Sequence, residues 1–218
     1  TNGENVGIGL TVDNLGDIIM TGFTALSINM ATVSAHQINY GGGMYDGFIA
    51  KFNPAGNRIW GTFYGGSSTD VITSVAIQGF STNNIVVSGY TNSTAAIATP
   101  SSYQPAYGGG AWDAFIVKFD SAGVRQWGSY YGGNDEEQSL GIAVEKPDNT
   151  YYIVGYTKSS SNISTPLSHQ PVFGGQEDGF IAKFAYSGDS LKWATYYGGS
   201  DIDQIHDIDI EYCKIAVC

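Results

Sequence analysis

Three carboxylates recur at one position of the sequence and could act as acids, bases or cation ligands. Each lies four residues after a Gly-Gly pair, and they are Asp70, Glu137 and Asp203. If copies of one unit surround an axis, these carboxylates could converge and bind a cation or a sugar. A group that recurs in every copy is more often part of the unit, where it accepts hydrogen bonds from backbone N–H groups at a turn. We favour this structural interpretation.

An aromatic or imidazole ring beside an amide also recurs three times, and such pairs suit hydroxyl-rich ligands. Rings stack on sugar faces, and amides exchange two hydrogen bonds with hydroxyl groups. Alternatively, each glutamine bonds to the backbone and holds its own loop, which its recurrence favours. Together with the three carboxylates, the candidate ligand-binding residues are His36, Gln37, Tyr103, Gln104, His169 and Gln170.

The acidic run SDIDQIHDIDIE breaks the symmetry between the copies and offers hard oxygen ligands. Ca²⁺ prefers such oxygens, but the glycine and the ligand order of a calcium loop are absent. Strand alternation would place Asp207, Asp209 and Glu211 on one solvated face. We therefore expect no cofactor and no metal site, with calcium at the acidic run as the lesser alternative.

No catalytic motif is recognisable in the sequence. A nucleophile elbow, a His-x-x-x-His zinc pair and a phosphate loop are all absent. We expect a protein that is not an enzyme and that has no catalytic residues. A hydrolase or lyase would need two carboxylates at the mouth of a ring, with pKa values that their surroundings push apart.

The composition indicates an all-β protein. A hydrophobic fraction of 42% over 218 residues is enough to bury a core. Thirty Gly and fifteen Tyr are typical of short strands joined by turns. The net charge of -11 would repel phosphate backbones and anionic lipid surfaces, so we expect no nucleic-acid partner.

The sequence contains no run of eighteen apolar residues and no signal-peptide pattern. We expect no membrane span, and either a cytoplasmic protein or the middle of a longer exported chain. Cys213 and Cys218 would lie roughly 16 Å apart on one extended strand. Two unpaired thiols are therefore favoured over a local disulfide.

A tandem repeat organises the whole chain. WGTFYGG at Trp60 returns as WGSYYGG at Trp127 and as WATYYGG at Trp193, at steps of 67 and 66 residues. Such a period predicts copies of one supersecondary unit, none of which can bury its own faces. We expect the three tryptophans to pack between the copies rather than to form a sugar-stacking platform.

Each copy contains four short alternating segments, which in the first copy are 6–12, 17–23, 46–52 and 58–66. Four antiparallel strands are the design of a propeller blade. Gly56 and its counterparts Gly123 and Gly188 are expected to adopt positive φ in a tight hairpin. Between the second and third segments lies a loop of about twenty residues, a length that predicts a functional loop or one ordered against the body.

Aspartate and lysine flank the third segment of every copy, as in Asp46 and Lys51. Their odd spacing places the two side chains on opposite faces of a strand. We therefore expect structural ion pairs between neighbouring copies rather than within one strand.

The series YQP, YGGGAWDAFIVKFDSAG, WGSYYGGNDEE, GIAV and YYIVGYT closely resembles the bacterial β-propeller repeat called SBBP, over essentially the whole chain. The resemblance implies propeller blades and a large secreted or cell-surface bacterial protein, and it implies no set of enzymatic residues. The first long loop departs from the pattern because it lacks the Thr-Pro present at Thr99 and Thr165. The stretch IEYCKIAVC also shortens the last hairpin.

We expect blades at 1–66, 67–133 and 134–199, and the first half of a fourth blade at 200–218. Half a blade leaves unpaired backbone groups at its outer strand, and fewer than four blades do not usually close a ring. We therefore expect a segment of a longer chain, in which later residues or another subunit complete the sheet, as a ring or as an open arc.

The expected function is a non-catalytic binding or scaffold module of a secreted or cell-surface protein, which presents its long polar loops to a protein or polysaccharide. One alternative is a polysaccharide hydrolase or lyase with carboxylates at the propeller mouth. The other alternative is a structural subunit or stalk of an extracellular assembly.

Overall fold

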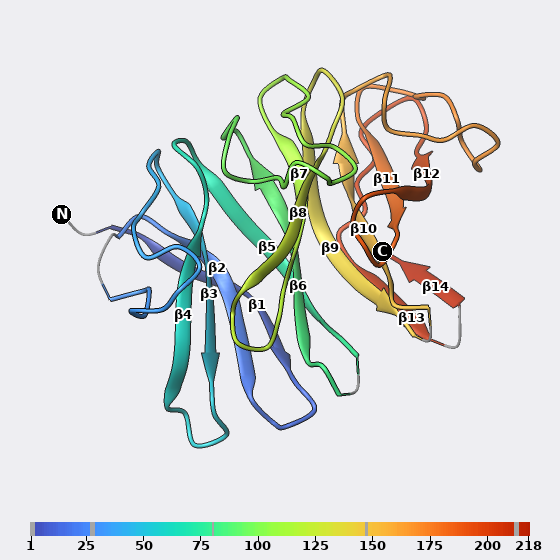
Figure 1. The fold of residues 1–218 in the computed structure, drawn as a ribbon. Helices are drawn as coiled ribbons and strands as arrows, with labels where there is room; N and C mark the ends of the chain where they lie inside the picture. Colours follow the sequence, from blue (N-terminus) through green and yellow to red (C-terminus); the bar gives the residue numbers. More distant parts are fainter. Residues whose placement is uncertain (1–2, 27–28, 80, 147, 212–213) are drawn as a thin grey trace.

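The computed structural model describes residues 3–26, 29–79, 81–146, 148–211 and 214–218, and strands are the regular elements in these ranges (Figure 1). The first sheet consists of β1 (Asn5–Val12), β2 (Ile18–Thr24), β3 (Asp46–Phe52) and β4 (Arg58–Tyr64). The second consists of β5 (Asp70–Gln78), β6 (Asn84–Thr91), β7 (Asp113–Phe119) and β8 (Arg125–Tyr131). The third consists of β9 (Glu137–Glu145), β10 (Thr150–Thr157), β11 (Asp178–Phe184) and β12 (Leu191–Tyr197), and a hairpin follows, made of β13 (Ile208–Glu211) and β14 (Lys214–Val217).

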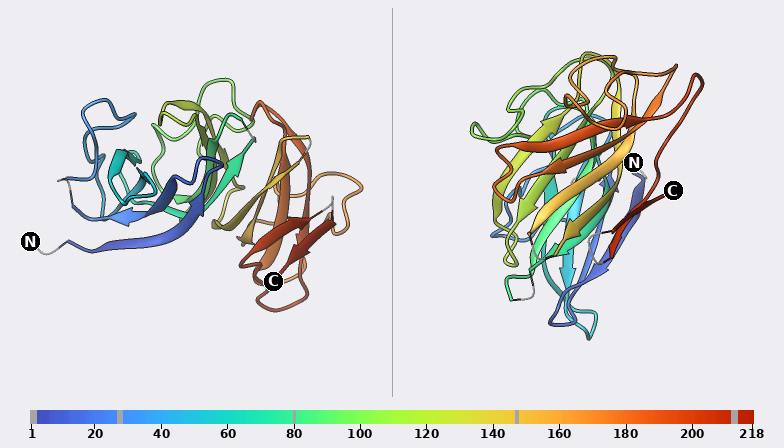
Figure 2. Two further views of the ribbon diagram at one scale, coloured as in Figure 1. Left: turned by 90° about the horizontal axis from the view of Figure 1, so that it is seen from below. Right: turned by 90° about the vertical axis from the view of Figure 1, so that its right-hand side faces the viewer.

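Each four-stranded sheet is antiparallel, with its strands in chain order. The expected all-β fold of four-stranded propeller blades is therefore confirmed. Successive sheets lie face to face in an arc, as the view from below shows (Figure 2). The first strands β1, β5, β9 and β13 contact one another in series and form the inner edge of the arc. Within the described residues, no helix is long and apolar enough to cross a membrane.

The hydrophobic core lies between the sheets. Trp60 and Tyr64 of the first sheet pack with Phe115 and Phe119 of the second in one buried cluster. The Trp60 Nε1 donates to the Ser121 carbonyl of the second sheet at 3.1 Å. Burial between blades was the expected role of the recurring tryptophan, and Trp60 confirms it.

The long loops run beside the outermost strand of their own sheet. In the first copy, Thr32 N donates to the Gly61 carbonyl at 2.8 Å, and Phe63 N donates to the Gln37 carbonyl at 3.1 Å. The same pair of bonds recurs in the other copies at Thr99 and Tyr130, and at Thr165 and Tyr196. Since an exposed strand edge is a template for aggregation, each loop protects the edge of its own blade.

The turn glycines behave as expected. Gly56, Gly123 and Gly188 have φ of 80°, 82° and 72° between the third and fourth strands. Gly123 and Gly188 also let the preceding blade approach, because a Cβ there would lie 3.1 Å and 2.3 Å from the rings of Trp60 and Trp127 respectively. The hairpin turn of one blade thus receives the indole of the blade before it.

Two of the three lysines form structural ion pairs, but the expected partner, an aspartate of a neighbouring blade, is wrong. Lys51 Nζ lies 2.8 Å from Asp13 and 3.1 Å from Asp17, which both belong to the turn between β1 and β2 of the same sheet. In the third sheet, Lys183 Nζ likewise lies 2.6 Å from Glu145. The lysine at the end of the third strand is adjacent to this turn, whereas the aspartate at its beginning is at the other end of the blade.

In the described part of the chain, the second sheet has no such ion pair. Gln78 stands at the end of β5, where the other sheets carry Asp13 and Glu145. Lys118 is buried, and its Nζ instead lies 3.7 Å from the centre of the Tyr186 ring. Burial lowers the pKa of Lys118, and the contact with Tyr186 offsets this effect only in part.

Replacing Gln78 with glutamate is expected to create the missing ion pair, to raise the pKa of Lys118, and to increase the free energy of unfolding by about 1 kcal/mol. Urea unfolding at neutral pH measures the change. The exposed Gln176→Glu serves as the control, with an expected effect within about 0.5 kcal/mol. If Gln78→Glu left the free energy of unfolding unchanged, the contact with the Tyr186 ring would already compensate the buried charge of Lys118.

Candidate binding site

The recurring amides form clamps within their own blades. Gln104 Oε1 accepts a hydrogen bond from Gly132 N at 3.0 Å, while its Nε2 donates to the Ala106 carbonyl and to Asp113, each at 3.2 Å. The other two glutamines make the same contacts: Gln37 with Gly65, Asn39 and Asp46, and Gln170 with Gly198, Val172 and Asp178. Because both ends of each amide are engaged, the geometry favours the structural interpretation.

The rings beside these amides face the next blade. The His36 ring lies 5.6 Å from Phe119, and the Tyr103 ring lies 5.8 Å from Phe184, both in edge-on contact. Desolvation, together with the positive charge of Arg125, lowers the pKa of His36, so this ring packs as a neutral group. His169 contacts Tyr197 of its own blade instead, at 5.9 Å.

The carboxylates after the Gly-Gly pairs hold the turns between blades. Asp70 is fully buried and accepts hydrogen bonds from Gly66 N at 2.8 Å, from Ser93 Oγ at 2.9 Å and from the Thr91 hydroxyl. Burial raises the pKa of Asp70 to about 6. Glu137 binds Gly133 N at 2.7 Å and Thr157 Oγ1 at 2.5 Å, and Asp203 binds Gly199 N at 2.6 Å.

A second carboxylate faces each of these turns. The sequence predicted an ion pair for this carboxylate. Asp113 is fully buried and accepts from Gly108 N at 2.6 Å and from Gln104. Burial raises the pKa of Asp113 to about 7. Gly132 lies between the two carboxylates, since a Cβ there would be 2.6 Å from Glu137 Oε2 and 2.8 Å from Asp113 Cγ. This crowding explains the first glycine of the pair.

The recurring carboxylates do not meet at the inner edge of the arc. A cavity of about 550 Å³ lies there, and Val12, Ile77, Val144 and Ile210 are among the residues of β1, β5, β9 and β13 that line it. Asp70, Glu137 and Asp203 are not among its lining residues. Each of the three binds the glycine of its own turn instead.

The acidic run supplies two carboxylates to this cavity, Asp209 and Glu211. Asp207, Asp209 and Glu211 are exposed while Ile208 is buried, which confirms the expected solvated face. In the described residues, no three His, Cys, Asp or Glu side chains group as metal ligands would. Of the two cysteines, Cys218 is exposed, and Cys213 lies outside the described residues.

A different group of side chains forms what we call the aromatic groove, a hollow of about 370 Å³ that the first and second blades line together with Gln138 of β9. The Phe23 and Tyr45 rings lie 4.5 Å apart at one side, and the Tyr90 and Trp112 rings lie 5.2 Å apart at the other. The remaining lining residues are Met44, Thr69, Val71, Asn92 and Gln138.

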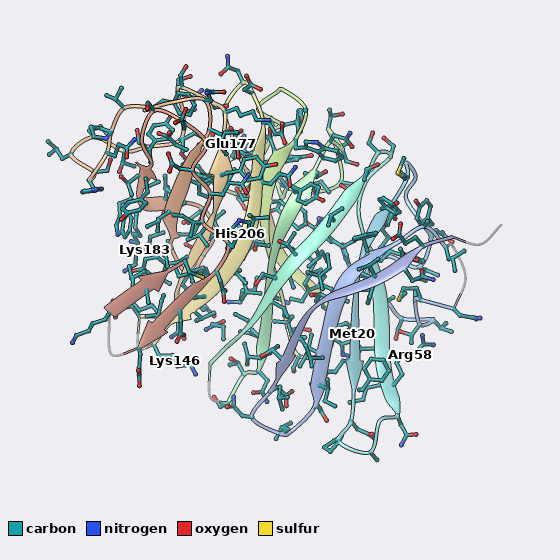
Figure 3. All side chains as sticks on the ribbon, turned by 180° about the vertical axis from the view of Figure 1, so that it is seen from behind. Met20, Arg58, Lys146, Glu177, Lys183 and His206 are labelled. Carbon is teal, nitrogen blue, oxygen red and sulfur yellow. The ribbon has the colours of Figure 1, made fainter. Side chains whose placement is uncertain are left out.

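Strand ends position this groove. Phe23 and Tyr90 lie near the ends of β2 and β6, where the long loops leave, and Tyr45 and Trp112 immediately precede β3 and β7, where the loops return. The groove is therefore at the loop-bearing end of the blades. The inner cavity is at the other end, and Lys146, one of its lining residues, lies far from Glu177 of the loop-bearing end (Figure 3).

The corresponding place beside the third blade is filled by ion pairs. Glu177 stands there in place of Tyr45 and Trp112, and the Tyr156 hydroxyl donates to Glu136 at 2.8 Å. Lys158 Nζ lies 2.8 Å from Glu136 and 3.7 Å from Glu177. The sequence reasoning missed the groove, although the series MYD, AWD and QED before the third strands already contained this difference.

Comparisons with known proteins found one distant similarity, to a protein with repeats. No protein-family model matches the chain, so the resemblance to SBBP stays a prediction. The chain is 26% identical over 147 residues to an uncharacterized WD repeat-containing protein of Acanthamoeba polyphaga mimivirus. The match covers 63% of this chain and 10% of that protein. This similarity agrees with propeller-type repeats.

Replacing Gln104 with alanine is expected to lower the free energy of unfolding by about 2–3 kcal/mol, because Gly132 N and Asp113 each lose a buried partner. Thermal and urea unfolding measure the change. The matched control is His169→Ala, at an exposed ring beside another of the clamps, with an expected loss below about 0.5 kcal/mol. Equal, small effects of the two variants would contradict the structural role of the glutamine.

Proposed function

We propose that this chain is a non-catalytic binding or scaffold module that holds a protein or polysaccharide partner at its loop-bearing end. The aromatic groove carries this proposal. Its four rings are only half-buried, and the third copy lacks one ring of the pair, because Glu177 replaces Tyr45 and Trp112 there. Residues that every copy needs serve the blade, whereas a binding site breaks the symmetry of the repeat.

The burial of the recurring carboxylates supports a non-catalytic module over a hydrolase or lyase. Asp70 and Glu137 are fully buried and accept hydrogen bonds from their own turns, so a substrate has no access to them. Glycosidic cleavage needs two carboxyl groups that flank one bond of the substrate. The resemblance to SBBP supports a secreted or cell-surface bacterial protein as the setting, and it brings no catalytic residues. We propose no cofactor and no bound metal.

The proposal predicts that partner binding depends on the groove and not on the exposed parts of the loops away from it. Trp112→Ala is expected to weaken capture of partners from a displayed peptide library or a glycan array at least tenfold, because a large stacking surface is lost. The control is Val33→Ala, a 94% exposed side chain in the first long loop, with no expected effect. The proposal would be refuted if Trp112→Ala left binding unchanged, or if the chain bound neither the peptide library nor the glycan array.

A structural subunit of an assembly is the second candidate, and the outer face of the third blade favours it. The Tyr64 hydroxyl donates to the Ile97 carbonyl of the next blade at 2.6 Å, and the Tyr131 hydroxyl donates to the Ile163 carbonyl at 2.8 Å. The equivalent Tyr197 is 51% exposed. Beside it lies a hollow of about 470 Å³, and Pro166, Leu167, His169, Ile181 and Trp193 are among its lining residues.

This second candidate predicts head-to-tail association through the outer face of the third blade. Tyr197→Glu is expected to abolish any concentration-dependent association in sedimentation velocity, because a charge would be buried at the contact. The control is Leu15→Glu, which places the same charge at a 73% exposed leucine in the turn between β1 and β2. A wild-type chain that stays monomeric at every concentration would exclude self-assembly through this face.

A further inference from the structure

We infer that the aromatic groove binds a proline-rich segment of a partner protein in the polyproline II conformation. This inference rests on the proposed binding function and names the ligand class for the same site. Three properties of the groove lead to it: its ring surfaces, its surplus of hydrogen-bond donors, and the uncompensated negative charge beside it.

The rings offer flat apolar surfaces on two sides of one groove. Phe23 and Tyr45 meet at 53°, and Tyr90 and Trp112 meet at 84°, so neither pair forms one flat platform. Val71 adds an apolar side chain to the lining of the groove. Proline rings on an extended helix fit grooves lined by aromatic side chains, because a preformed polyproline II helix loses little conformational entropy on binding.

The groove has a surplus of hydrogen-bond donors, because Trp112 Nε1 and Asn92 Nδ2 only donate, and the Tyr90 and Thr69 hydroxyl groups donate as well as accept. In the described residues, the Tyr90 hydroxyl, the Trp112 Nε1 and the Asn92 Nδ2 have no hydrogen-bond partner, whereas Asn92 Oδ1 already accepts from Thr69 N at 2.8 Å. Thr69 Oγ1 accepts from Met44 N at 3.1 Å and retains its own proton to donate. The Gln138 side chain contributes an acceptor. Its Nε2 donates to Glu136 at 3.1 Å, and its amide oxygen can accept a hydrogen bond from a ligand.

A donor-rich groove selects a ligand that is rich in acceptors and poor in donors. Proline residues have a carbonyl acceptor and no N–H, so a proline-rich strand brings only acceptors. Each hydroxyl group of a sugar brings a donor as well, and a donor without a partner loses its hydrogen bond to water. This balance favours a proline-rich peptide over a polysaccharide at this site.

The charge beside the groove favours a basic residue next to the prolines. The Tyr45 hydroxyl donates to Glu4 at 3.0 Å, and Glu4 is exposed with no cationic partner in the described part of the chain. The net charge of -11 acts in the same direction over a longer range. By contrast, Glu136 at the other side of the groove is already paired with Lys158.

The size of the groove suits one helical turn. One turn of polyproline II has about three residues and rises roughly 9 Å. A hollow of about 370 Å³ is near the lower end of the range of ligand pockets, which start at about 300 Å³. The corresponding position beside the third blade is occupied by the Glu136–Lys158–Glu177 network, so we expect one peptide for each chain.

The test titrates the whole chain with a synthetic peptide of eight prolines followed by arginine, by isothermal titration calorimetry. Tyr90→Phe keeps the ring and removes only the hydroxyl group, and it is expected to weaken binding about three- to tenfold. Trp112→Ala is expected to weaken it more than tenfold. Glu4→Gln is expected to weaken this peptide a few-fold without changing the affinity of eight prolines that lack the arginine.

Controls separate a binding effect from a folding effect. Tyr103→Phe removes a hydroxyl from a ring that faces Phe184 instead of the groove, and it is expected to leave the affinity unchanged. Thermal unfolding of every variant reports whether the fold is intact. A peptide of the same length with alanine in place of proline is expected not to bind.

The outcomes distinguish this inference from the proposed function. No binding of the proline peptide, or binding that is insensitive to both Tyr90→Phe and Trp112→Ala, overturns the inference. If cellohexaose or another neutral oligosaccharide binds instead, and Trp112→Ala removes that binding, the inference fails while the proposed function stands. If neither ligand class depends on the groove, both fail.

Discussion

The structure depends on a junction that every blade repeats between its long loop and its last strand. A loop amide, such as that of Gln104, binds both Asp113 and the Gly-Gly turn, and the carboxylate of the next blade, here Glu137, binds the same turn from the other side. The contact joins four pieces of chain at once. Because Gly132 has no side chain, the two buried carboxyl groups can approach the turn. The loop is thereby held where it protects the outer strand.

This junction also explains why the recurring polar residues are poor candidates for chemistry. A buried carboxylate is stable only where hydrogen bonds replace its water, and the turn glycines and the Thr and Ser hydroxyl groups provide those bonds. The same atoms are then unavailable to a ligand. Features that distinguish the copies remain open to function: the rings of the aromatic groove, which Glu177 and its ion pairs replace beside the third blade, and the exposed ring of Tyr197.

Much of the fold was predictable from the sequence because it arises from local patterns. Alternating apolar residues predict the strands, and Gly56 and its counterparts predict the tight turns by their tolerance of positive φ. The partners of the lysines were not predictable in this way. Lys51 pairs with Asp13, which is 38 residues away along the chain and becomes a neighbour only when β1 and β3 lie in one sheet. Spacing within one strand has no information about that contact.

The sequence by itself determined the repeat, the four strands of each blade and the solvated acidic face at Asp207, Asp209 and Glu211, because period and alternation are properties of neighbouring residues. Only the tertiary structure decided which polar residues are buried in junctions and which aromatic residues form a groove. Phe23, Tyr45, Tyr90 and Trp112 come from two blades, and they meet because the blades pack face to face and the loops begin and end at one end of the sheets. A binding site made at such a contact depends on distances in space, which residue order alone does not contain.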